Sequence, residues 1–524
     1  MFRKLAFALC AISILIIAQV SLAGNKIPHL QKQANVTQLI VDDKPFLILG
    51  GELGNSNASS LDYMKPIWPK LVQMNLNTVL APVYWDLIEP QEGKFDWTLV
   101  DGLITGARQH NLRLVLLWFG SWKNSMSCYV PAWVKTNQQR FPRARPQNGQ
   151  AMEILSAFDN ENCQVDAQAF AALMRHIRKI DGDKHTVIMV QVENEVGMLQ
   201  DARDYSDSAN KAFNLPVPKE LIDCLHKNEG NWEAVFGKGI ATDEIFMAWY
   251  YARYINQVAA AGKAEYPLPM FVNAALIRSG YKPGQYPSAG PLPHLFDIWR
   301  AAAPQIDFFA PDIYFDFVDW CQKYHQDSNP LFIPETGRDL HSEINVFYVI
   351  GKYDAMGFCP FSIESAPDPV NAPISKSYEV LSQLAPLILE KQGSGQMTGV
   401  LLDKENQTQE VNLGEYTLKI SHGYTFKWTP RPAGVETWPL AGGIIISAGP
   451  DEYVIAGTGL IVTFAANPPS EQIAGIVAIE EGKYVNGCWV SGRRLNGDEN
   501  HQGRHLNLPF GRFGIQRVKL YNYH

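Results

Sequence analysis

Eight short apolar segments, spread between Phe46 and about residue 380, restrict the fold of this chain more than any other feature. Most are separated by longer stretches with helical spacing, as in 96–111 and 167–180. The eight segments are 46–52, 78–85, 113–120, 186–193, 270–276, 307–314, 331–335 and 357–364. Apolar strands that alternate with helices are typical of a parallel sheet buried on both faces. Eight such units predict a closed (β/α)8 barrel, with an open doubly wound sheet as the alternative.

The sequence favours the barrel and predicts a second domain after it. The nucleotide-binding fingerprints of open sheets, G-x-G-x-x-G and G-x-x-x-x-G-K-[ST], are absent. We therefore assign residues 24–390 to the barrel. From residue 391 onward a short Gly- and Ser-containing linker leads into alternating strands and turns. This change of pattern predicts an all-β, sandwich-like domain over 391–524.

The first 23 residues have the pattern of a secretory signal peptide. Arg3 and Lys4 precede an apolar run over 5–20, and the small residues Ser21 and Ala23 form a cleavage signal. The run is short for a transmembrane helix, and no later stretch is long enough to span a bilayer. We therefore expect a secreted or periplasmic protein with no membrane span after removal of the leader.

Charge and cysteine usage exclude several classes of partner. The formal net charge of −8 argues against binding to nucleic acid or anionic membrane surfaces. The histidines and cysteines are scattered, and neither C-x-x-C nor H-E-x-x-H occurs, so we expect no metal site and no cofactor. One or two disulfides would be compatible with an exported chain.

Polar and aromatic side chains follow the predicted barrel strands where such enzymes place their active sites. That place is the carboxyl end of the strands. The residues are Glu52, Trp85, Glu89, Trp122, Lys123, Asn124, Glu193, Asn194, Glu195, Asp312, Tyr314, Glu335 and Glu364. Carboxylates and amides suit sugar hydroxyls, and indole rings suit the apolar face of a sugar. This rim therefore predicts a carbohydrate site.

Two carboxylates on different strands suit the cleavage of a glycosidic bond, because one protonates the leaving oxygen while the other attacks the anomeric carbon. The fourth and seventh strands face each other across the barrel, which makes Glu195 and Glu335 natural opposites. The fourth strand also offers Glu193, and pleat parity cannot separate residues i and i+2 because they share a face. A separation of roughly 5–5.5 Å would indicate retention of configuration through a covalent glycosyl-enzyme.

Four motifs carry a resemblance to a known family. They are "QVENEVG" at 191–197, "IPETG" at 333–337, W-x-x-x-E-P-x-x-G-x-F-D at 85–96 and "VPAW" at 130–133. Over about 36–385 the chain resembles family 35 of the glycoside hydrolases, whose members are mainly β-galactosidases. That family belongs to a clan of retaining barrel enzymes with the acid/base on strand four and the nucleophile on strand seven.

The resemblance implies a role for each of several residues. Glu195 would be the general acid and then the general base, and Glu335 the nucleophile. Asn194 would bind the sugar's 2-hydroxyl, Tyr314 would donate to Glu335, and Glu193 would be structural. The implied activity is the release of terminal β-D-galactosyl residues. The usual substrates of the family, together with the expected export, suggest plant cell-wall oligosaccharides, such as xyloglucan side chains, as substrates.

The sequence also departs from the better-known members. Their first-strand "SGSIHY" is "GGELGN" at 50–55, and their acidic third loop is "GSWKNSMSC" at 120–128. Lys123 and Asn124 fall where that loop would contact galactose O3 and O4, and Trp85 and Trp122 are expected to contact the sugar. A long insertion at about 198–240 would form one wall of the site. Two alternatives stay open: another β-glycoside (a glucoside or an arabinopyranoside), and a non-catalytic carbohydrate-binding barrel.

Overall fold

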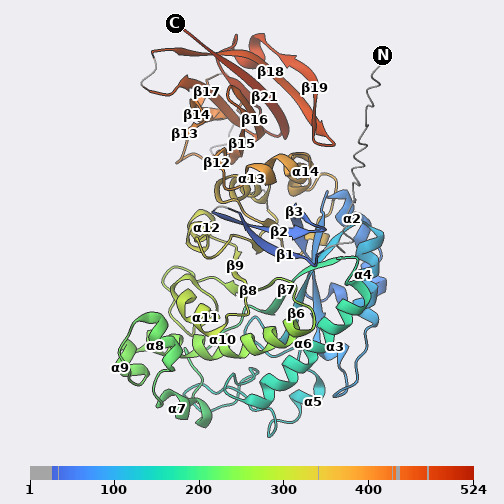
Figure 1. Ribbon diagram of the computed structural model, residues 1–524, viewed down its shortest axis with the longest axis vertical. Coiled ribbons are helices and arrows are strands. Elements are labelled where there is room, and N and C mark those ends of the chain that lie inside the picture. Colours follow the sequence, from blue (N-terminus) through green and yellow to red (C-terminus); the bar gives the residue numbers. More distant parts are fainter. Residues whose placement is uncertain (1–25, 34, 340, 428, 432–436, 469–470) are drawn as a thin grey trace, which may run out of the picture.

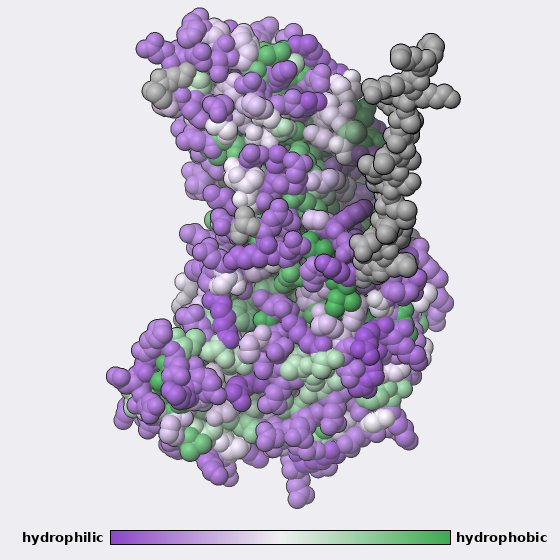
Figure 2. Space-filling view, in the orientation of Figure 1, coloured by the Kyte–Doolittle hydropathy of each residue, from purple (hydrophilic) through white to green (hydrophobic). Residues whose placement is uncertain are grey.

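A computed structural model describes residues 26–33, 35–339, 341–427, 429–431, 437–468 and 471–524. The predicted leader, residues 1–23, lies outside this part of the chain. Along the long axis, a small N-terminal sheet lies between the barrel and a C-terminal pair of sheets (Figure 1). The face drawn in Figure 2 is mostly hydrophilic, with apolar residues interspersed. Within the described ranges, no helix combines the length and apolar character that a bilayer crossing requires.

Eight parallel strands close into a barrel, in the order β10-β11-β4-β5-β6-β7-β8-β9. They are β4 (Ile48–Glu52), β5 (Thr78–Tyr84), β6 (Arg113–Lys123), β7 (Val187–Asn194), β8 (Met270–Ala275), β9 (Phe308–Ile313), β10 (Ile333–Thr336) and β11 (Gly357–Pro360). Almost every residue of these strands is buried, as expected for strands covered on both faces. The closed barrel confirms the predicted (β/α)8 fold, and the open doubly wound sheet is excluded.

Helices lie outside the barrel strands (Figure 1). The long ones are α4 (Thr98–Gln109), α6 (Asn160–Asp181), α10 (Ile240–Glu265), α13 (Ser342–Tyr353) and α14 (Pro373–Lys391). The shorter ones are α1 (Leu61–Met64), α2 (Ile67–Gln73), α3 (Trp85–Ile88), α5 (Ala132–Lys135), α7 (Asp207–Phe213), α8 (Lys219–Leu225), α9 (Trp232–Phe236), α11 (Phe296–Ala302) and α12 (Phe317–Tyr324). Five 3₁₀ helices complete this set: η1 (Asn57–Ser59), η2 (Pro293–Leu295), η3 (Ile363–Ser365), η4 (Gly423–Thr425) and η5 (Gly497–Asn500). The α6 helix begins where the Asp159 side chain accepts from the backbone N–H of Asn162, a typical N-cap.

An antiparallel sheet that the sequence reading missed precedes the barrel. It consists of β1 (His29–Gln33), β2 (Val36–Val41) and β3 (Lys44–Phe46). Asp42 and Asp43, between β2 and β3, both have positive φ (51° and 60°), as a two-residue type I′ hairpin requires. Phe46 therefore belongs to this hairpin, and the first barrel strand begins only at Ile48. At the other end of the barrel, β11 stops at Pro360, so Glu364 lies in η3 rather than on a strand.

The C-terminal region contains two antiparallel sheets, as the alternating pattern predicted. The larger has the order β12-β15-β16-β21-β18-β19 and the smaller the order β13-β14-β17-β20. Their strands are β12 (Met397–Leu402), β13 (Thr408–Leu413), β14 (Tyr416–His422), β15 (Ala441–Gly449), β16 (Glu452–Thr458), β17 (Leu460–Ala466), β18 (Ile473–Val485), β19 (Cys488–Leu495), β20 (Leu506–Leu508) and β21 (Gly514–Tyr523). One apolar cluster contains residues of both sheets, among them Leu418 and Ile455, so the sheets pack face to face.

Close backbone packing joins the larger sheet to the barrel. The α13 helix lies against β12 and β15, and a Cβ on Gly399 would stand 2.3 Å from the carbonyl oxygen of Tyr348. A Cβ on Gly351 would likewise lie 2.6 Å from the backbone nitrogen of Gly399. Glycine at both positions is therefore what lets the helix approach the sheet so closely. The six cysteines of the described ranges are all unpaired in this structure.

Candidate active site

Four carboxyl groups meet at the carboxyl end of the barrel. Glu52 is the last residue of β4, Asp312 lies in β9, Glu335 lies in β10, and Glu195 follows β7 directly. Carboxylate oxygens of Glu195, Asp312 and Glu335 all lie within 4.8 Å of one another. All four side chains are buried. The two glutamates predicted to share the chemistry are thus adjacent, although their strands, β7 and β10, are separated by only β8 and β9 and do not lie directly opposite each other.

The backbone at the end of β7 explains why two glutamates that are two residues apart point to different parts of the molecule. Glu193 and Glu195 both have left-handed backbone conformations, with φ of 62° and 45°. The strand is therefore not regularly pleated here, and the expectation that the two side chains share a face is wrong. The Glu193 carboxylate accepts from the backbone N–H groups of Ser121 (3.1 Å) and Trp122 (2.7 Å), and it interacts with the Asp166 carboxyl of α6. Glu193 supports the end of β6, and Glu195 faces the barrel mouth.

The surroundings of Glu195 suit a general acid. Its backbone N–H donates to Oδ1 of Asn273 (2.9 Å), whose Nδ2 donates to Oδ2 of Asp312 (2.6 Å), and Nδ2 of Asn124 donates to the Glu195 carboxylate. Burial and then the Glu335 carboxylate raise the pKa of Glu195 to about 7. Asn273 was not singled out from the sequence, although an amide at the end of a buried strand, in "MFVNAAL", was the available signal. A carboxyl with a pKa near 7 is still half protonated at neutral pH, as proton donation requires.

Glu335 has one bonded and one open carboxyl oxygen. The Tyr314 hydroxyl donates to its Oε1 at 2.5 Å, while Oε2 has no partner among the described residues. Burial and the neighbouring Glu335 carboxylate raise the pKa of Tyr314, so the phenol stays protonated and keeps donating. Tyr314 itself is half exposed at the rim. A buried carboxylate oxygen without a partner, close to a group that can donate a proton, is a candidate nucleophile.

Lys123, Asn124 and Asn194 form one connected group beside Glu195. The Lys123 ammonium donates to Oδ1 of Asn194 (2.9 Å), and Nδ2 of Asn194 has no partner within the described ranges. The backbone N–H groups of Asn124 and Ser125, both with positive φ, donate to the carbonyls of Asn194 (3.1 Å) and Glu195 (3.0 Å). These bonds tie the loop after β6 to the end of β7, and the open amide of Asn194 can serve a ligand.

The two indoles expected to contact sugar occupy other places. Trp85 and Trp122 are both fully buried. Nε1 of Trp85 donates to Glu89 (2.7 Å), and its ring packs against two other tryptophans. Nε1 of Trp122 donates to the Leu155 carbonyl (3.2 Å), with tyrosine rings of α10 against its face. Neither ring has a face open to a ligand, so the structure does not support their assignment to substrate binding.

A cavity of about 220 Å³ opens beside the acidic cluster. Its lining includes Glu195, Ala275, Arg278, Tyr281, Gln285, Tyr286, Asp312, Tyr314 and Phe315. Tyr281 is half exposed, so the available aromatic faces come from the segment after β8 and from the end of β9. The sequence reading missed this segment because residues 277–290 follow no strand or helix pattern that would place them at the mouth.

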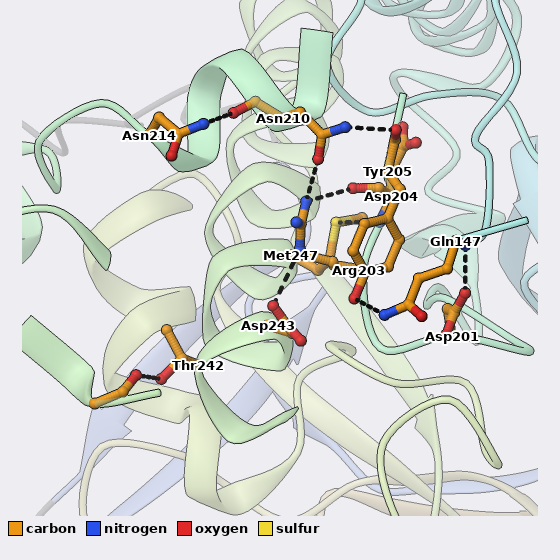
Figure 3. Close-up of polar contacts among 11 residues, drawn as sticks. Gln147, Asp201, Arg203, Asp204, Tyr205, Asn210, Asn214, Thr242, Asp243 and Met247 are labelled. Carbon is orange, nitrogen blue, oxygen red and sulfur yellow. Dashed lines mark hydrogen bonds and ion pairs between the residues drawn. The ribbon is translucent and has the colours of Figure 1, made fainter. Parts of the chain in front are cut away.

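The insertion after β7 contributes to the wall of this cavity. Met198 and Leu199 form bridges with Ser288 and Gly284, next to the cavity-lining residues. Figure 3 shows how Arg203 fixes the insertion: its guanidinium donates to Oδ1 of Asn210 (2.9 Å) and pairs with Asp243 of α10 at 3.1 Å. The insertion is therefore anchored to a barrel helix.

The Glu195, Asp312 and Glu335 carboxylates are also close enough to offer three oxygens to a metal ion. Hydrogen-bond donors, however, already occupy one oxygen of each: Asn124 on Glu195, Asn273 on Asp312 and Tyr314 on Glu335. Two of the three groups also have raised pKa values, because burial and the neighbouring carboxylates favour the protonated form. This cluster is better suited to holding protons than to holding a cation.

Comparison with known proteins gives two matching families. Residues 62–245 match the Glyco_hydro_42 family, described as "Beta-galactosidase", and residues 374–507 match DUF5597, a domain of unknown function. A β-galactosidase of Xanthomonas manihotis is 28% identical over 176 residues, which cover 32% of this chain and 27% of that protein. The chain thus matches about a quarter of the length of this relative. The first match includes Glu195 and ends before Glu335.

Solved structures with similar architecture include glycosidases. The β-galactosidases of Marinomonas ef1 (10% identity, TM-score 0.46, 65% of this chain and 60% of theirs) and Rahnella sp. R3 (14%, 0.46, 66% and 57%) are two. A third is the β-amylase catalytic domain of Paenibacillus polymyxa (10%, 0.47, 64% and 98%). The sequence matches show that residues 62–245 are similar to the Glyco_hydro_42 family of β-galactosidases. They do not support the resemblance to family 35 that the motifs suggested.

Proposed function

We propose that the protein is a retaining exo-β-galactosidase. The observation that carries the proposal is the meeting of Glu195 and Glu335 at the barrel mouth, with carboxylate oxygens within 4.8 Å of each other. Retaining glycosidases hold their two carboxyl groups about 5–5.5 Å apart, whereas inverting enzymes leave room for a water, at about 6.5–9.5 Å. The short separation in this barrel favours the retaining class. The match of residues 62–245 to a β-galactosidase family supports the sugar.

The reaction would proceed in two displacements. In the first, a Glu335 oxygen attacks the anomeric carbon while Glu195 donates its proton to the departing glycosidic oxygen, leaving a glycosyl ester on Glu335. In the second, Glu195 takes a proton from a water molecule as that water attacks the same carbon, and Glu335 departs as a carboxylate. Each step leaves Glu195 in the protonation state that the other step requires.

The remaining polar groups would hold the sugar. The unpartnered Nδ2 of Asn194 is free to donate to the 2-hydroxyl, a contact expected to strengthen in the transition state. Lys123 fixes the orientation of that amide through Oδ1. Asn124 occupies the Glu195 carboxylate and keeps it turned toward the mouth. We further propose that the substrates are galactosylated plant cell-wall oligosaccharides and that residues 1–23 direct export.

Initial rates on a panel of aryl β-glycosides test this function. Wild type would be compared with Glu335→Ala and with Glu364→Gln, a buried carboxyl at the same end of the barrel that instead binds the backbone of Gly54. We expect galactoside turnover in wild type and Glu364→Gln and its loss in Glu335→Ala. Proton NMR of the first product should show the β-anomer; the α-anomer would refute retention.

Two outcomes would replace parts of the proposal. Greatest turnover on a glucoside or an arabinopyranoside would keep the mechanism and assign a different sugar, with the loop of Lys123 and Asn124 as the place to look. No turnover of any glycoside, together with binding of galactosylated oligosaccharides by calorimetry, would make the protein a carbohydrate-binding barrel.

A further inference from the structure

The proposed reaction uses two of the four carboxyl groups at the barrel mouth and leaves Glu52 without a role. Glu52 closes β4 and is 1% exposed. Its side chain lies within hydrogen-bond reach of the Glu335 carboxylate. No donor among the described residues reaches its Oε1. A buried carboxyl group with an unpartnered oxygen is costly, so this one requires an explanation.

A single proton would remove the repulsion between the Glu52 and Glu335 carboxyl groups. Two ionised carboxylates in direct contact repel each other, whereas a single shared proton turns the contact into a charge-assisted hydrogen bond. Tyr314 already donates to Oε1 of Glu335, which stabilises the anionic form of that residue, while Oε2 is open. Glu335 already accepts from a donor, whereas Oε1 of Glu52 accepts from none, so the proton of this contact belongs on Glu52.

We propose that Glu52 is a positioning residue: it is protonated and donates its hydroxyl to Glu335, so that Tyr314 and Glu52 together orient the attacking carboxylate. This inference rests on the proposed function, since it gives Glu335 the role of nucleophile. The two donors would fix the plane of the carboxylate with one lone pair toward the anomeric carbon. In the glycosyl ester, the Glu52 hydroxyl would donate to the oxygen of Glu335 that is not bonded to the sugar.

The groups around Glu52 are consistent with this protonation state. Burial raises the pKa of Glu52 most, the Glu335 and Glu195 carboxylates raise it further, and the Lys123 ammonium lowers it. The titratable groups that interact with this cluster come from five elements: Lys123 of β6, Glu195 after β7, Asp312 and Tyr314 at β9, Glu335 of β10 and Cys359 of β11. A single lysine does not neutralise this many carboxylates, so a protonated Glu52 lowers the repulsion in the cluster.

The kinetics of two substitutions at Glu52 test whether this residue acts as a hydrogen-bond donor or as an anion. Glu52→Gln keeps the shape and an N–H donor, and Glu52→Leu removes the donor; Glu364→Gln is the matched control at the same barrel end. We expect Glu52→Gln to keep kcat within about tenfold of wild type and Glu52→Leu to lose on the order of 10²-fold, with KM little changed. The inference would be overturned if Glu52→Leu were as active as wild type, or if Glu52→Gln were as impaired as Glu52→Leu.

Infrared difference spectra test the proton without relying on activity. Wild type minus Glu52→Gln, at neutral pH, should show the carbonyl stretch of one protonated carboxylic acid, and wild type minus Glu364→Gln should not. Absence of that band would mean that Glu52 is ionised and would overturn the inference whatever the kinetics. If the band is present and wild type cleaves no glycoside, the proposed function fails while the protonation of Glu52 stands.

Discussion

Two groups of buried carboxyls lie near the carboxyl end of this barrel, and they are partnered in opposite ways. In the first, Glu193 and Asp166, every oxygen has a donor: two backbone N–H groups for Glu193, and the Trp118 indole and the Ser121 hydroxyl for Asp166. In the second, Glu52, Asp312 and Glu335 each keep one oxygen without a partner.

We interpret the difference as one between carboxyls that support the fold and carboxyls that we propose to act in catalysis. A buried carboxylate whose oxygens are all occupied stabilises the backbone that donates to it. In the second group, burial and then the Glu335 carboxylate raise the pKa values of Glu52 and Asp312, and the open oxygens add no hydrogen bond to the fold. Such strain is retained where chemistry requires it. Burial alone therefore does not identify the site, because both groups are equally buried.

The largest expected effect is on catalysis, from a change in the second group, Glu52, Asp312 and Glu335, which we call the open group because each keeps one unpartnered oxygen. Glu335→Gln should lower kcat on aryl galactosides by on the order of 10⁴-fold, because the amide is a poor nucleophile. The same change should leave the free energy of unfolding unchanged or higher, since it removes one charge from a repelling cluster. Chemical denaturation alongside the kinetics checks both. A variant that lost stability as well as activity would undo the distinction between the two groups.

The second largest expected effect is a loss of stability, from a change in the packing around Glu193 and Asp166, the group whose oxygens all have donors. Trp122 donates its backbone N–H to Glu193, and its indole is fully buried. Trp122→Ala should lower the free energy of unfolding by about 3–5 kcal/mol, as large-to-small changes in a core do. KM of the folded fraction should stay near wild type, because the ring has no face toward the cavity. A large rise in KM with unchanged stability would restore the original expectation that Trp122 binds sugar.

A smaller loss of stability is expected from Glu193 itself. Glu193→Leu leaves two buried N–H donors, those of Ser121 and Trp122, without acceptors, at a cost of about 2–4 kcal/mol in unfolding free energy. Activity should fall as well, since these residues lead directly into Lys123 and Asn124. Glu193→Gln should recover part of the stability, because the amide oxygen accepts one of the two bonds. Equal stability of both variants would argue against the backbone-supporting role.

The sequence predicted the barrel and predicted that Glu195 and Glu335 lie at the same end of it, since eight apolar strands and the rule that sites lie at strand ends are properties of pattern. Their catalytic roles stay a prediction. It could not separate Glu193 from Glu195. That separation depends on left-handed backbone at two non-glycine residues, which pleat parity does not anticipate. Gly120 of β6 is part of the same arrangement, because a Cβ there would lie 2.6 Å from Oε1 of Glu193.

The sequence also could not predict the packing of the two tryptophans or the contacts of Asn273. Strand position placed Trp85 and Trp122 at the carboxyl end of the barrel. The packing of each indole, however, depends on helices distant in sequence: Trp85, at the start of α3, packs against Trp133 of α5, and Trp122 packs against Tyr251 of α10. Asn273 acts through Asp312, whose position on another strand becomes apparent only when the barrel is closed.

The pH dependence of the reaction is the finest test of the comparison. Burial and the Glu335 carboxylate raise the pKa of Glu195 to about 7. An acid acts only while protonated, so kcat/KM for a substrate with a poor leaving group should fall about tenfold per pH unit above that value. With a dinitrophenyl leaving group, which departs without a proton, Glu195→Gln should retain the first displacement and lose this alkaline decline. The Glu193 and Asp166 pair, closed off from the cavity, should contribute no ionisation to the profile. An alkaline decline that persists in Glu195→Gln with that leaving group would instead indicate that a carboxyl of the open group titrates in the profile. Glu195 and the open group would then titrate together.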